Sequence, residues 1–222
     1  MDGTGAAESS TGAVEGGTGE RAGPREPLVL LAAGGLALAV SAIHPKDYFT
    51  WLLEVAPILI GVPVLVATYR RFPLTPLAYR LILVHAVILM VGGHYTYAEV
   101  PLGFWVERAL GLARNHYDRL GHFAQGFVPA VLAREVLLRR SPLRTGKWLF
   151  FLVTCVCLAI SACYEFVEWW TAVLTGDSAT AFLGTQGDPW DTQWDMFLAL
   201  VGAITAQLTV ARVHDRQLDR LR

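Results

Sequence analysis

Six apolar stretches make up most of this chain, and each is close to the length that a helix needs to cross a bilayer. They fall at residues 28–43, 49–68, 78–97, 120–138, 148–173 and 193–211. About 20 helical residues cross the roughly 30 Å of hydrocarbon in a membrane. Charged residues are only 17% of the chain, against about 25% in soluble domains. The sequence therefore predicts an all-α, polytopic transmembrane helix bundle of about six spans, with the lipid bilayer as its main partner.

Composition divides the chain into three parts. Residues 1–26 are rich in Gly, Ala, Ser, Thr and Glu and lack apolar periodicity, which predicts a disordered cytoplasmic tail. Residues 27–212 form the predicted transmembrane helical domain. Residues 213–222 form a short basic tail, which we also expect in the cytoplasm.

The first apolar stretch is the shortest and allows a second interpretation. It contains Gly34 and Gly35, and Arg21 and Arg25 precede it. With the small residues 40–42 near its end, it also has the pattern of a cleavable signal peptide. We favour a retained span, because the distribution of charge along the chain is consistent with one.

Basic residues alternate between the two sides of the predicted membrane domain. If all six stretches span and the amino terminus is inside, thirteen Lys and Arg residues lie inside and four outside, with Arg134 in the fourth span. Cytoplasmic loops carry an excess of Lys and Arg, so this pattern predicts that both termini are cytoplasmic. The formal net charge of −1 gives no overall attraction for nucleic acid.

Polar side chains from five predicted spans reach the same outer depth. A carboxylate at the edge of the hydrocarbon costs several kcal/mol unless it finds a partner, so we expect these residues to line one pocket. The titratable members are Glu54, His94, Asp118, His122, Glu165, Glu168, Asp191 and Asp195. The same side also receives Asn115, Arg119, Gln125, Tyr164 and Asp188. Between these segments, residues 104–112 have the amphipathic pattern of an interfacial helix.

Helical spacing arranges six of these residues in three pairs. Residues three or four apart share one face of a helix. The pairs are Asp118 with His122, Glu165 with Glu168, and Asp191 with Asp195. Imidazole and carboxylate groups are ligands for zinc, manganese and iron, and carboxylates alone suit magnesium or calcium. The three pairs are therefore the predicted ligands of a divalent metal ion.

A second interpretation gives the same polar residues a packing role. Arg114 and Arg119 can neutralise the carboxylates, while Tyr164, Asn115 and Gln125 complete hydrogen bonds. Such a network holds helices together without chemistry. For Asp191, just before the sixth stretch, a simple helix cap is at least as good an explanation as a metal ligand.

Several short segments carry a resemblance to a known family. They are Gly93–Ala98, Asn115–Phe123, Gln125–Pro129, Tyr164–Trp169 and Gly184–Met196. Through these segments the chain resembles the YjdF-like family of bacterial inner-membrane proteins over residues 28–211. The resemblance implies a multi-pass protein of the bacterial cytoplasmic membrane, and it implies no catalytic roles.

The pattern best fits metal-dependent chemistry on a lipid or lipid-linked substrate, by a hydrolase or transferase of the outer leaflet. A bound metal lowers the pKa of water and polarises the group to be cleaved. An ion- or proton-coupled transporter is the first alternative, and a non-catalytic assembly or partner protein is the second. Only His85, Arg134 and Glu135 continue a polar path through the inner half, so a one-sided pocket fits surface chemistry better than conduction.

Overall fold

The computed structural model describes residues 25–221, apart from the side chains of Asp177 and Ser178. The predicted disordered tail lies outside the described residues, except for its last two. All regular secondary structure in the described part is helical, which confirms the all-α prediction. The long helices are α1 (Arg25–Ser41), α2 (Tyr48–Thr68), α3 (Pro76–Tyr95), α5 (Tyr117–Arg140), α6 (Lys147–Thr175) and α8 (Asp191–Thr209).

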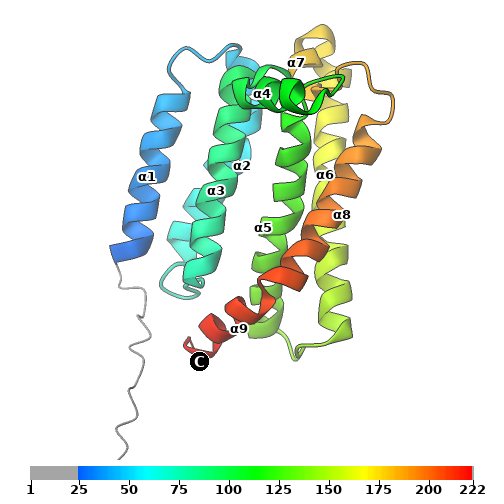
Figure 1. Ribbon diagram of the computed structural model, residues 1–222. Coiled ribbons are helices and arrows are strands. Elements are labelled where there is room, and N and C mark those ends of the chain that lie inside the picture. Colours follow the sequence, from blue (N-terminus) through cyan, green and yellow to red (C-terminus); the bar gives the residue numbers. More distant parts are fainter. Residues whose placement is uncertain (1–24, 222) are drawn as a thin grey trace, which may run out of the picture.

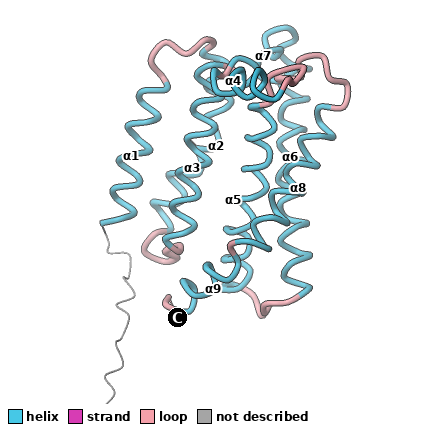
Figure 2. The backbone as a smooth tube through the Cα atoms, viewed as in Figure 1, coloured by secondary structure: helices cyan, strands magenta, loops and turns pink. Residues whose placement is uncertain are grey.

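Short helices occupy the two ends of the bundle. They are η1 (Tyr97–Glu99), α4 (Pro101–Leu110), η2 (Gly176–Ala179), α7 (Thr180–Leu183) and α9 (Ala211–Asp219). The long helices stand side by side, with α4 lying across one end and α9 near the other (Figure 1). We refer to these as the α4 end and the α9 end; loops join the helices at both (Figure 2). The amphipathic segment is thus helical, as predicted, and most of the predicted basic tail belongs to α9.

Among the described residues, three helices are long and apolar enough to cross a membrane, namely α2, α3 and α6. A fourth candidate is the pair α8 and α9, which are bent by 59° relative to one another. Helix α5 has 24 residues but carries charged side chains near both ends, and α1 has only 17 residues. The described residues therefore contain three or four candidate spans, while a count of six spans and the cytoplasmic position of both termini stay predictions.

Local signals in the sequence account for where two of the spans begin. The Asp47 carboxylate accepts a hydrogen bond from the backbone N–H of Thr50 at 2.7 Å and so caps α2. This bond lowers the pKa of Asp47 below its ordinary value. At α3 the Thr75 side chain is the cap, and Pro76 follows it in the first turn, where its missing N–H costs nothing.

Helices α5 and α8 make the closest contact in the bundle, because two glycines face the opposite backbone. A Cβ atom on Gly126 would lie 1.8 Å from the carbonyl oxygen of Ala199. On the other helix, a Cβ atom on Gly202 would lie 2.1 Å from the carbonyl oxygen of Phe123. Small residues of this kind let membrane helices approach until their backbones touch. The reciprocal pair fixes how α8 lies along α5.

A buried ionic network ties the α9 end together. Glu135 and His214 are fully buried, and the His214 Nε2 atom lies 3.0 Å from Glu135 Oε2. The same carboxylate accepts hydrogen bonds from the backbone N–H and the hydroxyl of Thr75. Arg139, one helical turn away, donates to Glu135 at 2.6 Å. Helices α3, α5 and α9 are thereby joined around one carboxylate.

Replacing Gly126 with alanine should strongly destabilise the protein. The new methyl group has no space beside the Ala199 carbonyl, so α5 and α8 must separate. Overpacking of this kind typically costs about 1–3 kcal/mol, and we expect the upper part of that range. Thermal unfolding of the protein in detergent measures the effect. Gly61→Ala is the matched control, since a Cβ atom there meets nothing within 4 Å. An equal melting temperature for the two variants would contradict the proposed contact.

Candidate functional site

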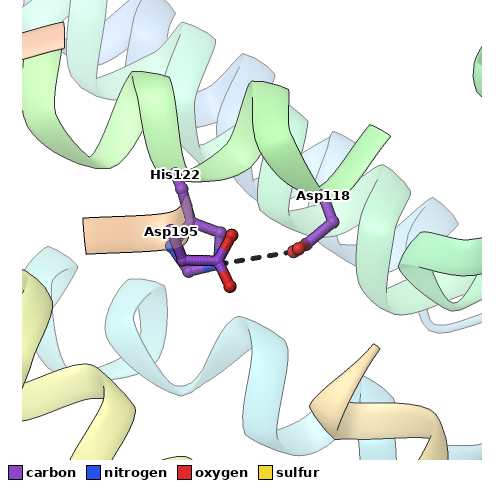
Figure 3. A group of neighbouring side chains, drawn as sticks. All are labelled: Asp118, His122 and Asp195. Atoms are coloured by element: carbon purple, nitrogen blue, oxygen red, sulfur yellow. Dashed lines mark ion pairs between the residues drawn. The ribbon is translucent and has the colours of Figure 1, made fainter. Parts of the chain in front are cut away.

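The α5–α8 contact places a histidine of one helix against acidic residues of both. His122 and Asp118 project from the same face of α5, and Asp195 of α8 lies beside the imidazole ring (Figure 3). The Nε2 atom of His122 is 3.4 Å from Asp118 Oδ1 and 3.7 Å from Asp195 Oδ1. The predicted i, i+4 pair on α5 is therefore present, and α8 adds a third donor to it.

The other ring nitrogen of His122 faces a different set of groups. Its Nδ1 atom is 3.1 Å from the Gln125 side-chain oxygen and 3.9 Å from Glu165 Oε1 on α6. Tyr164 of α6 packs its ring edge-on to the imidazole, with centroids 6.5 Å apart. The imidazole is thus held on both sides, and each nitrogen has its own neighbours.

Two groups of potential metal donors share this histidine. Asp118, His122 and Asp195 form the first group, and His122, Glu165 and Glu168 form the second. Within each group the donor atoms all lie within 4.8 Å of one another. Two of these atoms, Glu165 Oε1 and Asp195 Oδ1, are buried and have no hydrogen-bond partner. A buried oxygen without a donor costs free energy, so its persistence at the centre of a cluster calls for a cation or proton.

Glu54 joins the cluster from α2. It is buried, and it lies close enough to Asp118 and His122 to interact with their charges. The side chains of Tyr97 and Tyr164 also lie near this carboxylate. Four long helices therefore contribute side chains to one buried polar region near the α4 end.

Asp191 lies apart from both donor groups, although the sequence predicts it as a metal ligand. Its carboxylate is 2.9 Å from the guanidinium group of Arg114. The same guanidinium contacts Asp188 at 3.1 Å and donates to the Thr185 carbonyl. Helix α8 begins at Asp191 itself, so its N-cap position belongs to Trp190, whose side chain makes no capping hydrogen bond. The ion pair thus places Asp191 with Arg114 rather than in either donor group.

Arg114 and Arg119 together hold the segment that precedes α8. Arg119 is 3.5 Å from Asp188 and lies over the ring of Trp194, 5.1 Å from its centroid. Gln186 in this segment donates to the backbone carbonyl of Asn115 at 2.9 Å. These contacts join the start of α5 to the start of α8 at the α4 end of the bundle, next to the donor groups.

The remaining predicted pocket residues have local roles. Asn115 is buried; it donates to the Val100 carbonyl at 3.0 Å and accepts from the Tyr117 N–H, so it fastens the α4 segment to α5. His94 contacts the Ser41 carbonyl at 2.9 Å and belongs to neither donor group. Next to Asn115, burial and the nearby Arg119 and Arg114 charges keep the pKa of His116 below its ordinary value.

His214, the centre of the network at the α9 end, has no recognisable signal in the sequence. It lies in a segment expected to be a polar tail, where a single histidine has no helical partner to signal burial. Its environment depends on the bend between α8 and α9, which brings it to Glu135. Only contacts between residues distant in sequence reveal that position.

Fold and site together define a helical membrane protein with a buried histidine–carboxylate cluster near one end of its bundle. The chain belongs to the family described as predicted membrane protein DUF2238, whose model matches residues 26–216. The Inner membrane protein YjdF of Escherichia coli strain K12 is 57% identical over 198 residues, which cover 88% of this chain and 95% of that protein. The match confirms the resemblance seen in the sequence and the location in the inner membrane. No solved structure matches the chain.

Replacing Arg114 with glutamine should loosen the segment before α8. The change leaves the Asp191 carboxylate, only 8% exposed, without its cation. Losing one partner of a largely buried ion pair should cost about 2–3 kcal/mol. Hydrogen exchange of the backbone amides at residues 185–191 should accelerate. Arg108→Gln, on the exposed surface of α4, is the control and should leave exchange unchanged. Unaltered exchange in the Arg114 variant would show that the ion pairs do not hold this segment.

Proposed function

We propose that the chain is a six-span membrane enzyme that binds a divalent metal ion at Asp118, His122 and Asp195. Both termini are cytoplasmic in this proposal, with short tails outside the membrane domain. The α4 end then faces outward, and the ion lies just below the outer surface. The observation that carries the proposal is the group of three donor atoms around the Nε2 atom of His122, one of which has no other partner.

The donor separations support binding of a single ion. Two ligands about 2.1 Å from a tetrahedral metal are about 3.4 Å apart. The Nε2 atom lies 3.4 Å from Asp118 Oδ1 and 3.7 Å from Asp195 Oδ1, so a small movement of the second carboxylate suffices. Three protein ligands leave a fourth position for water or substrate, which is typical of catalytic rather than structural zinc sites.

The neighbours of the other ring nitrogen support the same assignment. A ligating histidine usually donates its second N–H to a carbonyl or carboxylate, which fixes the tautomer and the ring orientation. The Gln125 oxygen occupies this position, 3.1 Å from Nδ1. With Nδ1 protonated, the lone pair of Nε2 points to the carboxylates. Gln125 then orients the ligand without contacting the ion.

The proposed chemistry is hydrolysis or group transfer on a lipid or lipid-linked substrate. A metal held by these residues would lower the pKa of a bound water, and that water would be the nucleophile. Glu165, whose Oε1 atom has no hydrogen-bond partner, faces the Nδ1 side of the ring and stays outside the proposed coordination. A lipid substrate fits the location, because α4 presents Leu102, Trp105 and Leu110 as exposed apolar side chains at the same end of the bundle.

The packing of α5 against α8 argues against the transporter alternative. Between the donor groups and the network at the α9 end, these helices meet through Gly126, Ala130, Ala203 and Ala206. None of these side chains can relay a proton or bind an ion. A polar path through this contact would require the two helices to part, which the glycine contacts oppose.

Metal analysis of the full-length protein in mild detergent tests the proposal. We expect close to one equivalent of a transition metal in the wild type, and at least tenfold less in Asp118→Asn and Asp195→Asn, because each loses a charged ligand. Asp191→Asn is the matched control on the same helix. Its carboxylate is held by Arg114, so the metal content should stay at the wild-type level.

Two results would overturn the metal assignment. One is a folded wild-type protein that carries no metal and takes none up from buffered zinc or manganese. The other is equal metal loss in the Asp191 and Asp195 variants, which would indicate a general effect on folding. In the first case, a protonated His122 paired with Asp118 and Asp195 would account for the cluster as packing.

Gln125→Leu should weaken metal binding without removing a ligand. The variant keeps the side-chain volume and abolishes the acceptor for Nδ1, so the imidazole loses its fixed orientation. Loss of such a supporting group typically lowers metal affinity about 10–100-fold. Competition with a chelator of known affinity measures the change, and Gln125→Glu should restore most of it. Unchanged affinity in the leucine variant would assign the metal to the other ring nitrogen.

A further inference from the structure

An apolar groove of about 410 Å³ lies between α1, α2 and α3, on the side of the bundle away from the donor groups. Helices α1 and α2 each pack against α3, and they approach one another only near the α4 end, where Trp51 donates to Ser41 at 3.1 Å. Toward the α9 end the two helices leave an open space. Its walls include Leu31, Val62 and Leu83.

The groove is as deep as one leaflet of a bilayer. Its lining runs over Pro27–Leu38 on α1, Ile58–Tyr69 at α2 and Tyr79–Met90 on α3, twelve residues in each case. At a rise of 1.5 Å per residue, each wall is about 17 Å long from its first residue to its last. Half of the bilayer hydrocarbon is about 15 Å. The groove therefore begins near the headgroups at the α9 end and stops near the middle of the membrane.

The open end of the groove carries unpaired positive charge. Tyr69 and Tyr79, with ring centroids 6.3 Å apart, lie at this end, where amphipathic aromatic rings mark the level of the headgroups. Arg70 and Arg71 follow directly and are exposed, and no carboxylate within residues 25–221 pairs with either. Arg25 lies at the start of α1, at the same end. The nearby Glu26 is already paired with Arg80, so its charge is neutralised.

We propose that this groove binds an anionic phospholipid of the bilayer, with one acyl chain between α1 and α2 and the phosphate near Arg70 and Arg71. The apolar walls match the acyl chain in polarity and length. The arginines at the open end supply the positive charge that a phosphate requires. Each basic residue near an anionic headgroup raises the affinity about fivefold. This site goes beyond the proposed metal chemistry and does not depend on it.

The walls and the open end of the groove together favour a lipid over a helix of a second copy. A hydrocarbon chain is narrower than a helix, which is about 10 Å across, and it needs no polar contacts inside the groove. The arginines at the open end also distinguish the ligand, since a neutral apolar segment would gain nothing from them.

Lipid binding can be measured on the full-length protein by native mass spectrometry. The protein in detergent is titrated with phosphatidylglycerol and, separately, with phosphatidylcholine of the same chain length. We expect the wild type to bind phosphatidylglycerol at least tenfold more tightly. The double variant Arg70→Gln/Arg71→Gln should lose this preference while it still binds phosphatidylcholine. Arg144→Gln, in the exposed loop between α5 and α6, is the control for loss of charge.

A second variant tests the acyl-chain position separately. Gly35 lines the groove, and a Cβ atom there meets nothing within 4 Å, so Gly35→Leu fills space without a clash. Affinity for both lipids should fall at least tenfold. Gly61→Leu makes the same change on α2 at a position that also has open space but does not line the groove. It should bind both lipids like the wild type, and both variants should unfold at the wild-type temperature.

Three outcomes would overturn the proposal. The first is unchanged lipid binding by Gly35→Leu. The second is equal affinity of the wild type for the two lipids. The third is a dimer in solution that Gly35→Leu converts to a monomer, because the groove would then be an interface between two copies. These measurements are independent of the metal proposal, because they do not depend on whether the protein or its Asp195 variant binds a metal.

Discussion

The close approach of α5 and α8 is the contact on which the rest of the structure depends. Gly126 and Gly202 allow each helix to touch the backbone of the other. This contact fixes both the distance and the rotation of α8 relative to α5, so Asp195 must face His122. Toward the α4 end the two helices present their polar faces to one another, and toward the α9 end they bury alanine and valine. A polar cluster and an apolar core thus share one helix–helix interface.

The two buried ionic clusters differ in a way that separates structure from function. At the α9 end, both oxygens of Glu135 accept hydrogen bonds, and His214 contacts neighbours through both ring nitrogens. Around His122, by contrast, oxygens of Glu165 and Asp195 have no donor. A complete network stabilises the bundle by itself, whereas an incomplete one retains capacity for a ligand. For this reason we place the proposed chemistry at the α4 end only.

Much of this arrangement could be predicted from the sequence, because bilayer length and helical spacing are local properties. The length needed to cross a bilayer located the long helices, and helical spacing located the Asp118–His122 pair. They could not separate Asp191 from Asp195, since both lie on one face of α8 and only the position of Arg114 distinguishes them. The partner of His94 and the burial of His214 also depend on contacts between distant segments. The groove beside α1 has no sequence signal, because its walls have the same composition as any surface that faces lipid.

The position of His214 has a consequence for the order in which the chain assembles. Glu135 lies on α5, but its histidine partner lies on α9 and follows it in the chain only after α6 and α8. Until α9 has been made, the carboxylate must keep contact with water or rely on Thr75 and Arg139 alone. We expect the α9 ends of α3 and α5 to remain loosely packed until His214 reaches Glu135. Helix α9 would then complete the packing of a bundle whose preceding helices are already inserted.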